Sequence, residues 1–319
     1  MVVDGEEGEV YDAIGPSRIL FSPDSKHVAY IAGTLNDEWF VVIDGEEGNK
    51  YDEVFMWDER GHPKYSHDSQ HIAYLARVGD KWTVVLDEEE GNFYDESAYN
   101  LVFSPDSQHF AHEGERDGQM FIVLDGEEQK SYERALDPVF SPDSQHIAYK
   151  AKKNDKWFLV LDGKEGTLDN DFILSHNFSP DGQRLSKIVE SGDKELIVVD
   201  NIEQGTYEGI MGYPKFSPDS KRIAYTAYEG ENRSIIVDGE KIGSNEFPPF
   251  YFQFSPDSKH VISYGYTEVS EEYFIAIDGN TIGTTDEFFY PGVIIVSASN
   301  FHYVALKGNE VYLIEVEIK

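Results

Sequence analysis

The sequence predicts an all-β fold, an eight-bladed β-propeller of four-stranded antiparallel blades, and three observations lead to it. First, a Phe/Tyr-Ser-x-Asp motif recurs, with its aromatic residue at positions 21, 65, 103, 140, 178, 216 and 254. Second, an apolar run ending in Asp keeps the same spacing, from VVIDG at 41–45 to IAIDG at 275–279. Third, each repeat contains four short strand-like runs and lacks a helical period. Four strands in a repeat of about 40 residues are typical of a propeller blade.

Residues 17–54 illustrate one repeat. RILF, HVAYIA, WFVVID and KYDEV are rich in residues that favour strands, and Gly, Pro, Asp and Asn separate them. In the SPDS turn, Pro presets the backbone and Asp can accept a hydrogen bond from the chain ahead of it. Asp-Gly suits the later hairpin because Gly tolerates a positive φ. The motif therefore recurs because each unit needs the same hairpin between its first two strands.

The third strand of each repeat is apolar on both faces, as a blade between two other blades requires. Trp39, Trp82, Trp157 and Tyr273 occupy the same position, five residues before the Asp. We interpret these aromatic residues as packing between blades rather than as a ligand box.

The last repeat predicts how the ring closes. VIIVSAS (293–299), HYVALKG (302–308) and EVYLIEV (310–316) read as three strands without a fourth. EVYDAI (9–14) matches the fourth-strand pattern, so this N-terminal strand is expected to pair with the C-terminal strands. MVVDG resembles an additional third strand. The alternative is seven blades with extra terminal strands. In either case residues 1–319 are predicted to form one propeller domain.

Composition narrows the classes of partner. The chain has 61 acidic and 26 basic residues, which gives a formal net charge of −35. This charge repels nucleic acid and anionic membranes and attracts basic proteins. Such charge also favours a solvated monomer. The chain has no cysteine and no apolar run of the ~20 residues that a membrane span needs. We expect no membrane insertion, and a bacterial-type cytoplasmic, periplasmic or extracellular location stays open.

FSPDSKHVAYIA and FSPDSKRIAYTA resemble the WD40-like repeat found in the propeller domain of bacterial TolB and related proteins. The resemblance covers essentially the whole chain. It implies a rigid binding platform, and some propellers of this kind gate a neighbouring peptidase domain. Two departures matter. Val/Ile-Asp-Gly stands where true WD40 repeats carry Trp-Asp, and the helical N-terminal domain of TolB has no counterpart, so TolB's partners cannot be transferred.

Motifs of catalysis are missing from the sequence. G-x-S-x-G, a P-loop, a dinucleotide fingerprint, H-E-x-x-H and an EF-hand loop do not occur, so we predict neither an enzyme nor a cofactor. His109 and His112 have the spacing H-x-x-H beside Glu113. Because the position of His109 holds His27 or Arg184 in other repeats, it is interpreted as a polar turn exit. No metal site is predicted.

The turns DGEEG (44–48), DEEEG (87–91), DGEEQ (125–129) and DGKEG (162–166) should share one face with the SPDS turns. That face is strongly acidic, which indicates solvated charge. Diffuse cation binding or a basic partner is the alternative.

The links on the opposite face lead toward the central channel and are rich in aromatic residues, which suits a binding hot spot. Capping of the core ends is the competing interpretation. The long link 55–64 is the best single candidate, because its extra length is not needed for the fold. The candidate binding residues are Trp57, Arg60, His62, Tyr99, Tyr213, Phe250, Tyr251 and Tyr290.

The leading hypothesis is a non-enzymatic scaffold that binds a protein or peptide, a basic one included, over this aromatic face. One alternative is an accessory or gating propeller of an enzyme, or a hydrolase or lyase with its site at the channel mouth. Another is an acidic module that binds cations at its surface.

Overall fold

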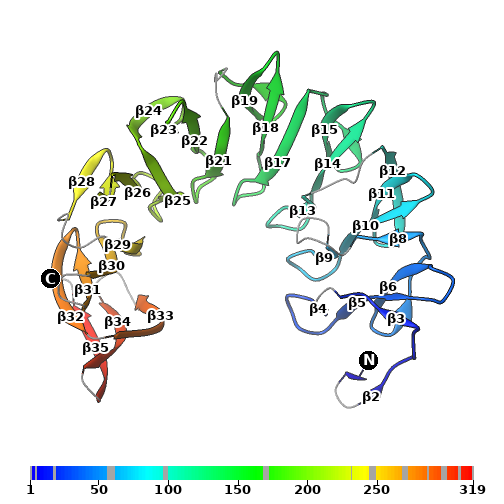
Figure 1. Ribbon diagram of the computed structural model, residues 1–319, viewed down its shortest axis with the longest axis horizontal. Helices are drawn as coiled ribbons and strands as arrows, with labels where there is room; N and C mark the ends of the chain where they lie inside the picture. The colour runs from blue at the N-terminus through cyan, green and yellow to red at the C-terminus, as the bar shows by residue number, and fades with distance from the viewer. Residues whose placement is uncertain are drawn as a thin grey trace. The chain divides into compact units, whose positions relative to one another are not determined.

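The computed structural model describes all residues except 1, 4–5, 17–18, 56–61, 96–99, 168–171, 231, 244–248, 268–271, 286, 296–299, 308–309 and 318–319. The chain divides into two compact units, Met1–Leu168 (unit 1) and Asp169–Lys319 (unit 2). One domain over residues 1–319 stays a prediction. Every regular element in the described part is a β-strand, which confirms the all-β class (Figure 1).

Unit 1 contains a short hairpin and four antiparallel sheets, numbered 1 to 4 in chain order. The hairpin is β1 (Val2–Val3) and β2 (Glu6–Glu7). Sheet 1 has β3 (Ala13–Ile14), β4 (Leu20–Phe21), β5 (Val28–Gly33), β6 (Trp39–Ile43) and β7 (Glu46–Glu47). Sheet 2 has β8 (Glu53–Val54), β9 (Lys64–Tyr65), β10 (Ile72–Val78), β11 (Lys81–Leu86) and β12 (Glu89–Tyr94). Sheet 3 has β13 (Val102–Phe103), β14 (Phe110–Arg116), β15 (Gln119–Leu124) and β16 (Glu127–Glu128). Sheet 4 has β17 (Arg134–Phe140), β18 (Ile147–Lys153), β19 (Lys156–Leu161) and β20 (Lys164–Glu165).

Unit 2 contains sheets 5 to 8. Sheet 5 has β21 (Ile173–Phe178), β22 (Leu185–Ser191), β23 (Lys194–Val199) and β24 (Ile202–Tyr207). Sheet 6 has β25 (Gly209–Phe216), β26 (Ile223–Glu229), β27 (Asn232–Val237) and β28 (Glu240–Ile242). Sheet 7 has β29 (Pro249–Phe254), β30 (Val261–Thr267), β31 (Glu272–Ile277) and β32 (Asn280–Thr285). Sheet 8 has β33 (Glu287–Ile295), β34 (Asn300–Lys307) and β35 (Glu310–Glu317).

Sheets 3 to 7 each pair four strands in chain order, as propeller blades do. In sheets 1 and 2 the first strand is split into two pieces that both pair with the second strand. The central strands are buried on both faces: Phe40, Val41 and Val42 of β6 are fully buried. Trp39 and Trp82 pack against the core clusters beside their strands, which confirms the packing interpretation for these two residues.

The predicted fourth strand KYDEV (50–54) is wrong in its second half. Tyr51 bridges Trp39 within sheet 1, but Glu53 and Val54 form β8 and pair with β10 of sheet 2. The strand divides here because Tyr51 contacts both sheets. Its backbone pairs with β6, and its ring packs edge-on against Tyr74 of the next sheet, at 6.2 Å and 72°. The chain crosses to sheet 2 directly after this contact.

The predicted pairing of EVYDAI (9–14) with the C-terminal strands is wrong for its last two residues. Ala13 and Ile14 form β3 and pair with Gly33 and Ala32 of sheet 1, so these two residues do not pair with the C-terminal strands. MVVDG does begin a hairpin of the third-strand type, since Val2 and Val3 pair with Glu7 and Glu6. Sheet 8 has three strands among the described residues. Eight blades and ring closure therefore remain predictions.

The SPDS turn is held by its own side chains. In sheet 1, the Ser22 hydroxyl donates to Asp24 Oδ1 at 2.7 Å and accepts the backbone N–H of His27 at 2.9 Å. Ser25 closes the turn with φ at 61°. Asp44, which directly follows β6, accepts the backbone N–H of Val28 and contacts His27 Nδ1 at 2.6 Å. The first and last hairpin turns of a blade therefore lie at the same end, as predicted.

Neighbouring sheets within a unit are joined by two recurring contacts. The last serine of one turn accepts the backbone N–H of the preceding turn's aspartate, as Ser107 does from Asp68 at 3.0 Å. A fourth-strand tyrosine packs against the second strand of the next sheet, as Tyr132 does against Tyr149 at 6.5 Å. Burial raises the pKa of Tyr149 to about 12. Both contacts repeat with the sequence, so the sheets pack in series.

Candidate functional site

Three of the eight candidate binding residues have described side chains: His62, Tyr213 and Tyr251. Trp57, Arg60 and Tyr99 lie outside the described residues. Phe250 lies in β29 and Tyr290 in β33, but their side chains are outside the described part.

His62, Tyr213 and Tyr251 occupy one repeat position, three residues before the aromatic residue of the turn motif. Asn100 and Asp137 hold it in sheets 3 and 4. In sheets 6 and 7 the strand register shifts there, as a β-bulge does, between Met211 and Lys215 and between Pro249 and Tyr251. A bulge turns a side chain out of the regular alternation, which explains why this position can leave the core.

In unit 2 this position carries exposed aromatic side chains. Tyr213 is 68% exposed and Tyr251 40%. Tyr251 lies beside the half-buried Tyr264, with ring centroids 5.2 Å apart. Lys215 Nζ lies 4.0 Å from the Tyr251 ring centroid and donates to the Phe252 carbonyl at 2.8 Å. Met211 is 39% exposed. We name the five residues Met211, Tyr213, Lys215, Tyr251 and Tyr264 the aromatic patch.

The geometry of the aromatic patch suits recognition. Tyr251 packs against the Tyr264 ring and the Lys215 ammonium. These two contacts hold its side chain, so little rotamer freedom remains to be lost on binding. Tyrosine offers a large apolar surface with a polar tip. The patch therefore combines exposed contact area with a fixed geometry.

In unit 1 the same position builds a charged network that the sequence analysis missed. The Asn100 side-chain amide donates to Glu113 Oε1 at 2.5 Å and to Asp137 Oδ1 at 3.2 Å. The backbone N–H of Asp137 donates to Glu113 Oε1 at 2.7 Å. Lys150 Nζ lies 2.5 Å from Asp137 Oδ2. Glu113 and Lys150 are almost fully buried, which makes them the most unusual charged residues described in unit 1.

A departure from the repeat could have revealed this network. Glu113 and Lys150 stand where Ile31 and Leu75 stand in sheets 1 and 2. A charge in a slot that is apolar in sheets 1 and 2 must be paired when it is buried. Here the pairing joins sheet 3 to sheet 4, so the network fastens two neighbouring sheets.

Each histidine of the H-x-x-H pair has its own partner within the protein. His109 Nδ1 contacts Asp125 Oδ2 at 2.8 Å, the contact that His27 and His71 make at this position in other repeats. His112 lies between the rings of Tyr94 and Phe110, and its Nδ1 donates to the Glu113 carbonyl at 2.9 Å. Burial lowers the pKa of His112 to about 4. Across the described residues, no group of three His, Cys, Asp or Glu side chains could hold a metal ion.

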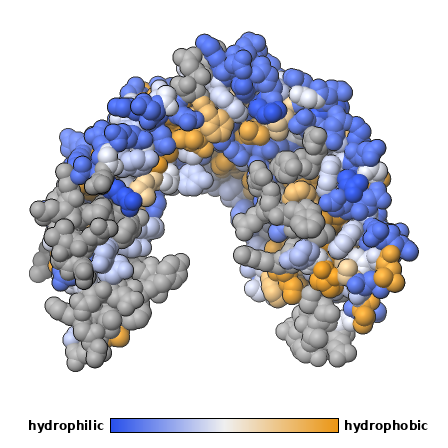
Figure 2. Space-filling model, viewed as in Figure 1, coloured by the Kyte–Doolittle hydropathy of each residue, from blue (hydrophilic) through white to orange (hydrophobic). Residues whose placement is uncertain are grey.

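The acidic turns are exposed. Glu46 and Glu47 of sheet 1, Glu127 and Glu128 of sheet 3 and Glu165 of sheet 4 all reach solvent. Hydrophilic residues predominate along the outer ends of sheets 3 and 4 in the view of Figure 2. Arg116 pairs with Glu128 at 2.7 Å, so part of the charge is compensated locally. Within the part of the chain that the structure covers, no helix is long and apolar enough to cross a membrane.

Comparisons with known proteins report on the fold. No protein-family model and no curated protein sequence matches the chain. Among solved structures, the chain is similar to a eukaryotic initiation factor, with 12% identity and a TM-score of 0.53 over 98% of this chain and 92% of that one. It also matches the β-propeller domain of the trilobed protease from Pyrococcus furiosus, with 14% identity and a TM-score of 0.40 over 86% and 96%. TolB from Acinetobacter baumannii matches with 16% identity and a TM-score of 0.33 over 77% and 76%. The first likeness shows a shared fold at low sequence identity and nothing of function.

Proposed function

We propose that the chain is a non-enzymatic propeller scaffold that binds a protein or peptide, and that the aromatic patch of unit 2 is its contact surface. The observation that supports this is the exposure of Tyr213 and Tyr251 at a position where sheets 3 and 4 carry Asn100 and Asp137. Tyrosines at the centre of an interface commonly contribute most of the binding free energy.

A basic partner fits best. The chain carries a net charge of −35, which raises the rate of encounter with a positively charged protein and disfavours an acidic one. The field attracts the partner, and the exposed tyrosines supply the contact area.

The test compares the wild-type protein with the double variant Tyr213→Ser/Tyr251→Ser. Phe93→Ser is the matched control, because Phe93 is 41% exposed and lies in unit 1. Proteins captured from a lysate of the source cells are quantified by mass spectrometry, and the best binder is purified and titrated. We expect the double variant to weaken binding at least tenfold, about 1.4 kcal/mol, while the control binds as the wild type does. Equal binding by all three proteins would overturn the proposal.

We further propose that the sheets form one eight-bladed ring, closed where N-terminal strands meet sheet 8. Phe21 of sheet 1 is 58% exposed, whereas its counterparts Phe103 and Phe140 are 7% and 9% exposed. Figure 2 shows hydrophobic residues gathered at the surface of sheet 1. On β35, Val311 and Leu313 are 62% and 63% exposed. Both surfaces carry apolar side chains that a neighbouring sheet or strand would cover.

A further inference from the structure

A cavity of about 350 Å³ lies between sheets 3 and 4 of unit 1 and is lined by residues other than those of the aromatic patch. Its apolar wall consists of Ile122, Leu124, Phe140, Ile147 and Tyr149. Volumes of about 300–1,000 Å³ with a mostly apolar lining and a few polar groups are typical of small-molecule sites. The cavity therefore has room for one small ligand.

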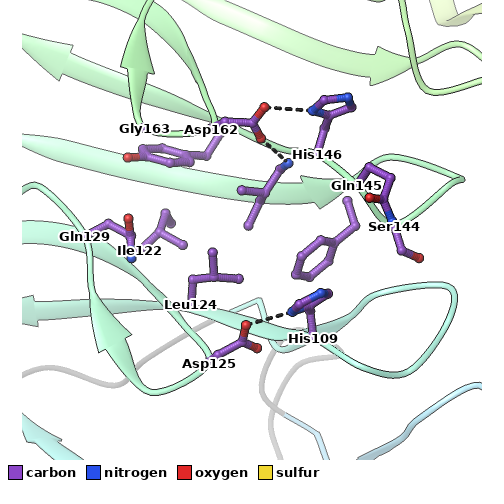
Figure 3. Close-up of a pocket in the computed structure, with 13 residues that line it drawn as sticks. His109, Ile122, Leu124, Asp125, Gln129, Ser144, Gln145, His146, Asp162 and Gly163 are labelled. Atoms are coloured by element: carbon purple, nitrogen blue, oxygen red, sulfur yellow. Dashed lines mark hydrogen bonds and ion pairs between the residues drawn. The ribbon is translucent and has the colours of Figure 1, made fainter.

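Two His–Asp pairs flank the apolar wall. His109 Nδ1 lies 2.8 Å from Asp125 Oδ2, and His146 Nδ1 lies 2.7 Å from Asp162 Oδ2. Figure 3 shows one pair on each side of the cavity, with Leu124 between them. The polar groups thus converge on the same space from two sheets.

Each imidazole at the rim is hydrogen-bonded to a carboxylate. A carboxylate oxygen only accepts hydrogen bonds, so Nδ1 of each histidine carries the proton and donates it. The side chains of His109 and His146 are 45% and 33% exposed, so a ligand can reach them. The rim of the cavity accordingly presents two carboxylate acceptors, each held in place by an imidazole.

Charge selects among ligands that could donate to these acceptors. Asp125 and Asp162 are carboxylates at the rim, and the whole chain carries a net charge of −35. Such a field concentrates cations and repels anions. The ligand must therefore donate hydrogen bonds and carry a positive charge. An amine does both, because it has N–H donors and is cationic. The apolar wall adds a preference for an amine with an apolar or aromatic body.

We propose that this cavity is a binding site for a small organic cation, an amine on an apolar or aromatic body, held between His109 and His146. The site uses residues that the scaffold function does not, so either proposal can fail without the other.

Tryptamine and indole-3-propionate test the proposal with the full chain, because they share an indole ring and differ in the sign of their charge. Binding is followed by titration in NMR spectra of the histidine side chains. We expect tryptamine to bind saturably and to shift the signals of His109 and His146. His27 and His260, which make the same hydrogen bond with Asp44 and Asp278, serve as internal controls and should not shift. Equal binding of the anionic compound, or equal shifts at all four histidines, would overturn the proposal.

Leu124→Trp fills the cavity and should weaken tryptamine binding at least tenfold. Leu86→Trp makes the same change at the equivalent position of sheet 2 and is the matched control, with binding expected to stay at the wild-type level. Undiminished binding by the Leu124 variant would contradict the assigned site. If that variant fails to fold, the histidine shifts of the wild-type protein decide the question by themselves.

Discussion

At the scale of single residues, the contacts between neighbouring sheets depend on one aromatic slot in the second strand. Tyr74 and Tyr149 fill it in sheets 2 and 4, and each meets a tyrosine of the preceding sheet. His112 fills it in sheet 3, where it meets Tyr94 at 5.6 Å. A histidine in this position can take up a proton, so sheet 3 contains a buried group that a tyrosine slot lacks.

His112 should make the stability of the protein depend on mild acid. Its pKa is lowered to about 4 by burial, from 6.5 in an unfolded chain. The unfolded state therefore binds the proton more tightly, and the stability from neutral His112 is complete above pH 6.5 and lost as pH falls toward 4. Unfolding by urea at several pH values should show a loss of about 3 kcal/mol over this range.

His112→Tyr, which introduces the residue that sheets 1, 2, 4 and 6 carry in this slot, removes this contribution. Its unfolding free energy should fall less between pH 6.5 and 4 than that of the wild-type protein. Parallel pH profiles for the two proteins would mean that His112 is protonated in the folded state.

At the scale of the element, the hairpin turn explains why six of the seven turn motifs have both serines, the exception being Gly182 in sheet 5. The first serine binds within its own turn, as Ser104 does to Asp106 at 2.6 Å, and the last serine reaches the turn of the preceding sheet. The last serine also adopts a positive φ, 62° at Ser107, which is costly for any residue but glycine. A residue kept in an unfavourable conformation indicates that its hydroxyl contributes more than the conformation costs.

Ser107→Ala removes the bond to Asp68 and keeps the unfavourable φ. We expect the free energy of unfolding to fall by about 1–2 kcal/mol, measured by urea denaturation. Ser107→Gly loses the same bond but relieves the backbone, which offsets up to about 1 kcal/mol. An alanine variant as stable as the wild type would show that the bond between turns contributes nothing.

The aspartate of the turn predicts sensitivity to strong acid. The Ser141 hydroxyl and the backbone N–H of Gln145 lower the pKa of Asp143 below its usual 3.8. Its stabilising effect is therefore present above pH 3.8 and is lost as pH falls below that value. Asp143→Ala should lower the melting temperature at pH 7 and have a smaller effect at pH 2. Asp143→Asn keeps an acceptor oxygen, so its melting temperature at pH 7 should lie between those of the wild-type protein and the alanine variant. A melting-temperature difference independent of pH would contradict this account.

At the scale of the whole molecule, the repeat alone predicted the strands, the turns and the face on which the two kinds of turn meet. Recurring residues such as Asp44 and Ser22 make the same bonds in each repeat, so pattern sufficed for them. The crossing point after Tyr51 escaped prediction because it depends on a contact with Tyr74 in the next sheet. The Glu113–Lys150 network also escaped prediction, because its pairing is visible only once sheets 3 and 4 are side by side.

The exposed Phe21 makes ring closure the central claim about the whole molecule. Because the chain contains no cysteine, two engineered cysteines can carry fluorescent dyes without competing sites. Val10→Cys and Glu315→Cys place them at exposed positions near β3 and in β35. Energy transfer between the dyes is measured in native buffer and in guanidinium, with the labelled protein diluted into unlabelled protein to separate contacts between molecules. A closed ring predicts high transfer in native buffer that dilution does not change and denaturant abolishes. Low transfer in native buffer, or transfer that dilution removes, would show that sheet 1 is not covered by sheet 8 of the same chain.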